Sequence, residues 1–235
     1  MRMRFIRCFL SEISKLLTVR GFLYALVGLI GIIIAGVYGF SVAARHGVID
    51  SSSAFTMPLY YGQAAVILLG CWLLIEETDG GCLRTTFLAV PSRTNVVCAK
   101  TAVAFLVSFD VSTVTIVLSY CARMLALNQA ISFRSLAGHI LYWTILGTFA
   151  FSLSAVLRNG TVSLGIILGT AFLLSAFLRA YLPAARYLPD QLGTVLCSPS
   201  STQSSFIEAL GALVLWEISA FIGSLVSAQT WEVGS

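Results

Sequence analysis

The sequence has few charged residues: Asp, Glu, Lys and Arg make up 10% of its 235 residues, whereas 58% are hydrophobic. A soluble domain carries about 25% charged residues, so this composition excludes an ordinary soluble globular protein. The apolar runs also lack the alternation and the length of about ten residues that barrel strands have. The sequence therefore predicts an all-α integral membrane protein whose residues 1–235 form one domain.

Lysine and histidine are scarce, which excludes several catalytic sites. The only lysines, Lys15 and Lys100, do not follow a glycine, so the chain has no G-x-x-x-x-G-K-[ST] phosphate-binding loop. His46 and His139 are too far apart for an H-E-x-x-H zinc motif, and no G-x-S-x-G nucleophile elbow is present. We expect that the chain is not an enzyme and that it binds no metal or cofactor itself.

The six cysteines show no C-x-x-C spacing. Cysteine packs well as a small apolar residue, and this is the role we expect for them. Only Cys121 and Cys197 could both lie on the outer side of a membrane, which leaves a disulfide between these two open.

Six apolar runs are long enough to cross a membrane, since ~20 helical residues cross ~30 Å of hydrocarbon. The expected spans are residues 22–43, 58–75, 99–121, 137–157, 162–178 and 206–228. With the amino terminus inside, the inner basic residues are Arg2, Arg4, Arg7, Lys15, Arg20, Arg84, Arg93, Lys100 and Arg158, and the outer ones are Arg45, Arg123, Arg134, Arg179 and Arg186. The excess of inner basic residues predicts that both termini are cytoplasmic.

Residues 1–20 form an amphipathic segment rather than a span. On a helix, its apolar side chains (Phe5, Ile6, Phe9, Leu10, Ile13, Leu16 and Leu17) share one face, and its charged side chains lie on the other. A basic amphipathic helix of this kind lies in the membrane interface. It could anchor the first span, or it could bind a partner.

A polar window, residues 75–100, separates the second and third predicted spans. Thr78 or Asp79 can cap a helix, Gly80 and Gly81 allow a sharp entry, and Pro91 ends the run. The window therefore predicts a short amphipathic helix on the cytoplasmic side. It is either a docking surface for another protein or a solvated loop helix.

Several turns are also predicted. Residues 158–160 join the fourth and fifth spans in a tight hairpin. Three prolines, Pro183, Pro189 and Pro199, break the apolar segment that follows, which predicts short helices at the outer interface. The G-x-x-x-G pair Gly165 and Gly169 predicts close helix packing, within one chain or between chains.

Two carboxylates, Asp110 and Glu217, fall near the middle of the third and sixth predicted spans. An acidic side chain at this depth is costly unless it is paired, hydrated or protonated. Both are candidates for a transport path. The alternative is a neutral acid hydrogen-bonded to a neighbouring Ser, Thr or Tyr, or to Gln63.

The whole chain resembles the type-2 family of ABC transporter permeases. The resemblance rests on SEISKLLTVRGF near the amino terminus, EETDGGCLRTTFLAVPSR after the second span, LSAVLRNGTVSLGIILG between the fourth and fifth spans, and YLPAARYLPDQL after the fifth. Their order and spacing also match that family. The chain departs from many relatives in ending SAQTWEVGS, without a basic cluster.

This resemblance implies a membrane subunit of an ATP-driven exporter in the bacterial cell membrane. It implies that a second permease copy or a paralogue pairs with the chain, and that a separate cytoplasmic subunit binds ATP and magnesium. By resemblance, an elbow helix carries Glu12, Lys15 and Arg20, and a coupling segment carries Glu76, Glu77, Gly81, Arg84, Thr85, Thr86, Pro91 and Arg93.

The expected substrate is amphipathic or hydrophobic, such as a drug, an antibiotic or an antimicrobial peptide, because the predicted outer loops are short. Two other functions stay open. The stretch DGGCLR (residues 79–84) partly resembles the D-G-x-x-A-R motif of CDP-alcohol phosphotransferases, which would make Asp79 a metal ligand. A membrane scaffold or immunity protein that works without ATP is the other.

Overall fold

The structure is a computed structural model, and it describes residues 20–79 and 93–229. The described part is helical, with no strand in it. The helices are α2 (Arg20–Arg45), α3 (Ser53–Asp79), α5 (Arg93–Leu127), α6 (Phe133–Leu157), α7 (Gly160–Gly169), α8 (Ser175–Tyr181), α9 (Pro189–Cys197) and α10 (Gln203–Gln229). A π-helical turn, Thr170–Leu174, joins α7 to α8, and a 3-10 helix, Pro183–Tyr187, precedes α9.

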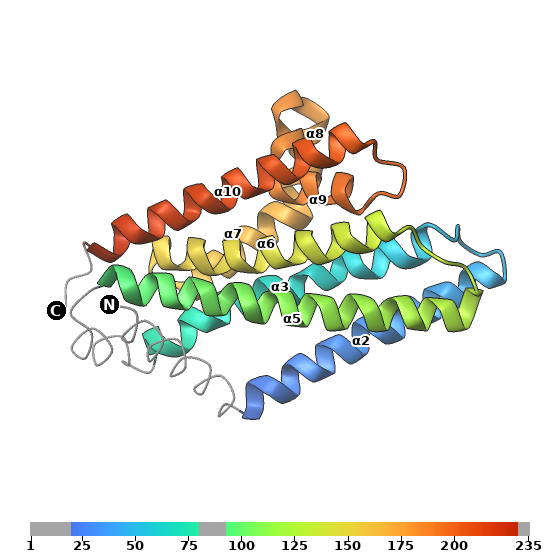
Figure 1. The fold of residues 1–235 in the computed structure, drawn as a ribbon, viewed down its shortest axis with the longest axis horizontal. Coiled ribbons are helices and arrows are strands. Elements are labelled where there is room, and N and C mark those ends of the chain that lie inside the picture. The colour runs from blue at the N-terminus through green and yellow to red at the C-terminus, as the bar shows by residue number, and fades with distance from the viewer. Residues whose placement is uncertain (1–19, 80–92, 230–235) are drawn as a thin grey trace.

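Five of these helices, α2, α3, α5, α6 and α10, are long and apolar enough to cross a membrane. They extend roughly along the long axis of the molecule, which is horizontal in Figure 1. This confirms an all-α fold with five of the six expected spans, and it is typical of a multi-pass membrane protein.

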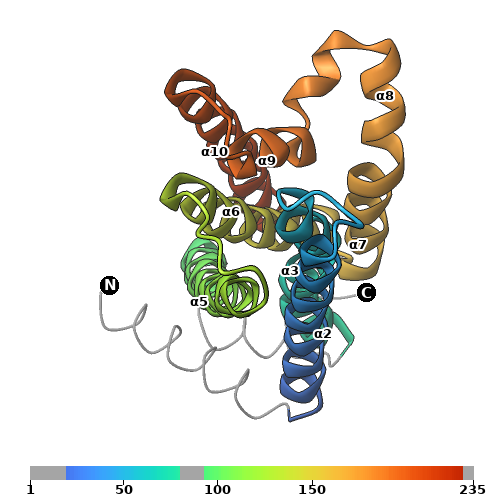
Figure 2. The same ribbon diagram turned by 90° about the vertical axis from the view of Figure 1, so that its right-hand side faces the viewer.

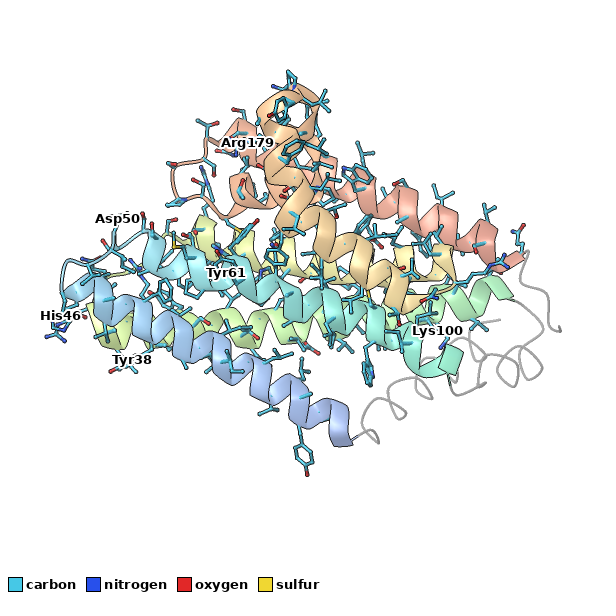
Figure 3. All side chains as sticks on the ribbon, turned by 180° about the vertical axis from the view of Figure 1, so that it is seen from behind. Tyr38, His46, Asp50, Tyr61, Lys100 and Arg179 are labelled. Atoms are coloured by element: carbon cyan, nitrogen blue, oxygen red, sulfur yellow. The ribbon has the colours of Figure 1, made fainter. Side chains whose placement is uncertain are left out.

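The two ends of the bundle can be told apart by their contacts. At one end, which we call the Asp50 end, Arg123 donates to the carbonyl of Ser51 and Arg134 Nη1 donates to the carbonyl of Ser201 at 2.9 Å. At the other, the Arg158 end, α3 and α10 finish and α5 begins. Figure 3 labels His46 and Asp50 at one end of the bundle and Lys100 toward the other.

Helix α6 lies at the centre of the bundle, packed against α3, α5 and α10 (Figure 2). Its large side chains Trp143 and Phe151 are almost completely buried. Two glycines permit the close approach of α3 and α6, because a Cβ on Gly70 would overlap the carbonyl oxygen of Gly147. Small residues of this kind let membrane helices pack backbone to backbone.

The predicted span 162–178 is not one regular helix. The N–H of Ser175 bonds the carbonyl of Thr170, five residues earlier, which is the π-helical spacing. Tyr60 of α3 donates to the carbonyl of Ala171 at 3.1 Å, within the same turn. Hydropathy does not detect such a turn because its residues, TAFLL, are as apolar as those of the flanking helices. The sixth span remains a prediction.

One predicted turn and one predicted set of short helices are confirmed. Arg158 and Asn159 alone separate α6 from α7, and the region after Tyr181 forms short helices. Helix α9 packs against both α6 and α10. Its end is fixed to α6 by a 2.6 Å hydrogen bond from Ser135 Oγ to the carbonyl of Cys197.

The third and second spans are longer than predicted. Helix α5 has 35 residues, so it is about 52 Å long, and α3 begins at Ser53 rather than at Pro58. The apolar runs of the sequence mark only the most hydrophobic part of each helix. The polar residues at the helix ends continue the helical backbone beyond it.

Candidate functional site

The coupling and elbow residues predicted from the sequence lie mostly outside the described residues. This holds for Gly81, Arg84, Thr85, Thr86 and Pro91 of the coupling segment, and for Glu12 and Lys15 of the elbow. Glu76 and Glu77 fall in the last turn of α3, Arg93 is the first residue of α5, and Arg20 is the first residue of α2. The coupling segment therefore connects α3 to α5 at the Arg158 end.

The Arg158 end is held together by the α6–α7 turn. Arg158 has a left-handed backbone (φ 56°), and its guanidinium donates to the hydroxyl and the carbonyl of Ser227 in α10, at 3.3 and 3.2 Å. Asn159 caps α7 by accepting from the N–H of Val162 at 3.0 Å. Gly160 lies against Ile75 in α3. The turn thus links α10 to the part of α3 that leads into the coupling segment.

A groove of about 510 Å³ lies midway along the bundle, between α5, α6 and α10. We call it the Glu217 groove; its lining residues are Cys98, Thr101, Ala102, Phe105, Leu106, Thr148, Glu217, Ile218 and Phe221. Oε1 of Glu217 accepts from Ser152 Oγ at 3.0 Å. Its Oε2 is buried and has no hydrogen-bond partner among residues 20–79 and 93–229. The groove is therefore largely apolar, and Glu217 is the acidic residue in its lining.

The structure separates the two intramembrane carboxylates. Asp110 is exposed at the midpoint of α5, whereas the groove lining on α5 ends at Leu106, one turn earlier. The neighbours of Asp110 on the exposed face include Phe109 and Val114. Of the two, Glu217 lines the groove and Asp110 does not.

A second cavity, of about 450 Å³, lies at the Asp50 end between α3, α6 and α9. We call it the Gln63 cavity. Its polar and aromatic lining residues are Ser52, Thr56, Tyr60, Gln63, His139, Tyr142, Trp143, Asp190, Thr194, Ser198 and Ser200. Tyr142 Oη donates to Gln63 Oε1 at 2.5 Å. The Nε2 of Gln63 is buried and has no partner within the described residues.

Asp190, in the first turn of α9, lies in a polar network beside this cavity. Its Oδ2 accepts from Ser175 Oγ and, at 2.8 Å, from Gln191 Nε2. Arg179 Nη1 in turn donates to Gln191 Oε1 at 3.0 Å. Burial raises the pKa of Asp190, although the hydrogen bonds from Ser175 and Gln191 act to lower it. The network attaches α9 to α8 just beyond the π-helical turn.

Sequence reasoning missed the Gln63 cavity as a site. Gln63 and His139 are isolated polar residues within apolar runs, and Asp190 follows a loop proline. An isolated polar residue in a membrane helix is a functional signal, which could have singled out the first two. Helix α9 folds back against α6 and so brings Asp190 close to Gln63 and His139. This arrangement is a property of the tertiary packing alone.

Other sequence expectations have these outcomes. Cys121 and Cys197 are both free thiols rather than a disulfide. Within the described ranges, no three His, Cys, Asp or Glu residues are close enough to hold a metal ion. The glycines Gly165 and Gly169 have nothing within 4 Å of their Cβ positions among residues 20–79 and 93–229, so neither packs closely against another of the described helices.

No protein-family model matches this chain, and no curated protein matches it either.

Proposed function

We propose that this chain is the membrane permease subunit of an ATP-driven exporter. Its Arg158 end faces the cytoplasm of a bacterial cell, and α7 together with α8 supplies the sixth span. The observation that carries the proposal is the Glu217 groove, an apolar concavity at mid-depth with one unpaired carboxylate oxygen. Ionisable residues within membrane helices are rare, and they mark substrate or ion pathways in many membrane proteins.

The groove favours an amphipathic substrate, such as a drug, an antibiotic or an antimicrobial peptide. Apolar side chains such as Phe105, Ile218 and Phe221 would contact its apolar part. Glu217 Oε2 would accept a hydrogen bond from a donor or a cationic group on the substrate. A long polysaccharide would find few polar contacts there.

Energy for export would come from a separate subunit, because the sequence contains no phosphate-binding loop. We assign docking of this ATP-binding subunit, which carries ATP and magnesium, to the coupling segment, residues 76–93. The segment connects α3 and α5 at the end where Arg158 joins α6 to α10. Movement of the segment would therefore be passed directly to helices that line the groove.

A second permease copy or a paralogue would complete the transporter. No described residue covers the small-residue face of Gly165 and Gly169. Faces of this type permit close helix contact between membrane chains. This open face is consistent with a dimer.

The assignment is tested by the double substitution Arg84→Glu and Thr85→Asp. The purified wild-type chain should co-purify with a P-loop ATPase and raise its ATP hydrolysis rate, and the double variant should do neither. A matched control, Arg134→Glu with Thr202→Asp at the Asp50 end, should stimulate the ATPase as the wild type does. ATP hydrolysis by the purified chain alone, or normal coupling by the double variant, would contradict the proposal.

The role of the groove is tested by Glu217→Gln and Asp110→Asn. Both variants should fold, since each replacement is nearly isosteric and removes a charge from a membrane helix. Transport of at least one amphipathic substrate should change in Glu217→Gln. If every substrate is transported normally by both variants, these carboxylates have a structural role only.

A further inference from the structure

The Gln63 cavity extends from the surface at the Asp50 end into the bundle. Ser52 and Ser200 at one side of it are exposed, whereas Gln63 and Tyr142 at the other are buried. Its volume of about 450 Å³ falls within the range of ~300–1,000 Å³ that is usual for small-molecule sites. A small molecule can therefore enter from this end without crossing the bundle.

Gln63 is a lining residue on the buried inner side of this cavity. The residue is 0% exposed, and the hydroxyl of Tyr142 already occupies its Oε1. Its Nε2 has no partner in the part of the chain that the structure describes. A buried amide without a partner costs about 1–3 kcal/mol, and an acceptor atom on a bound molecule would remove that cost.

The cavity also presents acceptors. Nδ1 of His139 lies 2.8 Å from the carbonyl oxygen of Ser135, and a carbonyl only accepts, so Nδ1 carries the proton and Nε2 of the neutral ring is an acceptor. Asp190 lines the same cavity. The Ser175 and Gln191 side chains donate to its Oδ2, and the backbone N–H groups of residues 190 and 191 also donate to its carboxylate. A ligand with a protonated amine matches this acceptor-rich lining.

Three aromatic residues also line the cavity. Tyr60, Tyr142 and Trp143 contribute from α3 and α6, and the hydroxyls of both tyrosines are already bonded, to Ala171 and Gln63. Their ring faces and edges are therefore what they offer to a ligand. Aromatic rings attract both planar apolar groups and cations.

We propose that the Gln63 cavity is a binding site for a small aromatic amine that also carries a hydrogen-bond acceptor. The amine contacts Asp190, the ring lies among the three aromatic side chains, and the acceptor receives the Gln63 amide. All of these residues belong to one chain, so the site needs neither an ATP-binding subunit nor a second permease copy. It extends beyond the proposed export function and stands or falls separately from it.

The probe is tritiated tyramine, which has an ammonium group, an aromatic ring and a phenol oxygen. Binding to the purified full chain in lipid nanodiscs is measured by scintillation proximity. Two competitors each lack one feature, since phenethylamine has no phenol and tyrosol has no amine. Because each competitor loses one hydrogen bond to a charged or buried group, its binding should be weaker than that of tyramine by about tenfold or more.

Two variants assign the contacts. Asp190→Asn should abolish the preference for tyramine over tyrosol, and Gln63→Leu should abolish the preference for tyramine over phenethylamine. The matched controls are Glu208→Gln and Gln203→Leu, which change exposed residues of α10 outside the cavity. Both controls should bind tyramine as the wild type does.

A further measurement does not depend on removing a buried polar group. Thr194 is exposed and lines the cavity, so Thr194→Cys should react with a maleimide, and tyramine should slow labelling at this position, as followed by mass spectrometry. The proposal is overturned if tyramine does not bind saturably, if the three compounds bind equally, or if tyramine leaves labelling at position 194 unchanged. Any of these results would mean that the cavity is not a binding site for a small aromatic amine.

Discussion

Helices α3 and α6 approach each other closely at Gly70. A Cβ at this position would overlap the carbonyl oxygen of Gly147, and it would lie 2.9 Å from the Cβ of Ala150 and 3.1 Å from the backbone nitrogen of Phe151. Two of these three atoms are backbone atoms of α6, so neither can move without moving the helix. Gly70→Ala must therefore separate the two helices or strain them.

The size of the effect follows from two opposing contributions. Overpacking a filled interior costs about 1–3 kcal/mol, whereas replacing glycine by alanine within a helix contributes about 1 kcal/mol of stability. A matched control isolates the first contribution. Gly211→Ala in α10 has the same gain in helix propensity, and nothing lies within 4 Å of its Cβ position. The free energy of unfolding should therefore be lower for Gly70→Ala than for Gly211→Ala by about 1–3 kcal/mol.

The assay is thermal unfolding of the purified full chain in detergent, followed by circular dichroism. A chain of this size loses about 2–4 °C in Tm per kcal/mol. Gly70→Ala should accordingly unfold about 2–12 °C below Gly211→Ala. Equal Tm values for the two variants would refute the close approach of α3 and α6.

Three further predictions concern single contacts. Tyr142→Phe removes the donor to Gln63, and the unpaired amide should lower the free energy of unfolding by about 1–3 kcal/mol in a denaturant titration. Asn159→Ala removes the cap on α7 and should lower the free energy of unfolding by about 1 kcal/mol in the same titration. Asn159→Ser keeps a capping oxygen and should retain most of that stability. Because burial raises the pKa of Asp190, the folded chain retains this proton after the unfolded chain has released it. The Tm should therefore fall as pH rises above about 4, and the fall should be smaller in Asp190→Asn; identical pH profiles would contradict this.

Much of the helical framework could be predicted from the sequence. Hydropathy located five helices of membrane-spanning length, and the short Arg158–Asn159 connection predicted the tight hairpin between α6 and α7. Proline positions predicted the broken helices before α10. These features depend on local composition, which a sequence shows directly.

The π-helical turn and the Gln63 cavity could not be predicted in the same way. Within the turn, the carbonyl of Ala171 accepts from Tyr60, a residue of another helix. The cavity joins Gln63, Tyr142 and Asp190, which are about 130 positions apart at the extremes and meet only because α9 folds back against α6. No periodicity in the sequence encodes a contact between elements so far apart.

The two intramembrane carboxylates, which sequence reasoning treated as equivalent, have different surroundings. Asp110 lies at the midpoint of α5, about 25 Å from either helix end, and its side chain is exposed. In a bilayer this exposed acid must be protonated, hydrated or covered by another chain. Glu217 is instead hydrogen-bonded to Ser152 through one oxygen and faces the groove.

This difference predicts unequal effects on transport. Glu217→Gln replaces a groove acceptor with an amide, so transport of a cationic amphipathic substrate should be slowed more strongly than by Asp110→Asn, which changes a residue outside the groove lining. The comparison is made by substrate efflux from cells at equal amounts of folded permease, with Glu208→Gln as the control. If Asp110→Asn slows efflux as much as Glu217→Gln does, the prediction is wrong. The Glu217 groove alone would then not account for the polar contact that the substrate needs. The substrate path would instead run along the exposed face of α5.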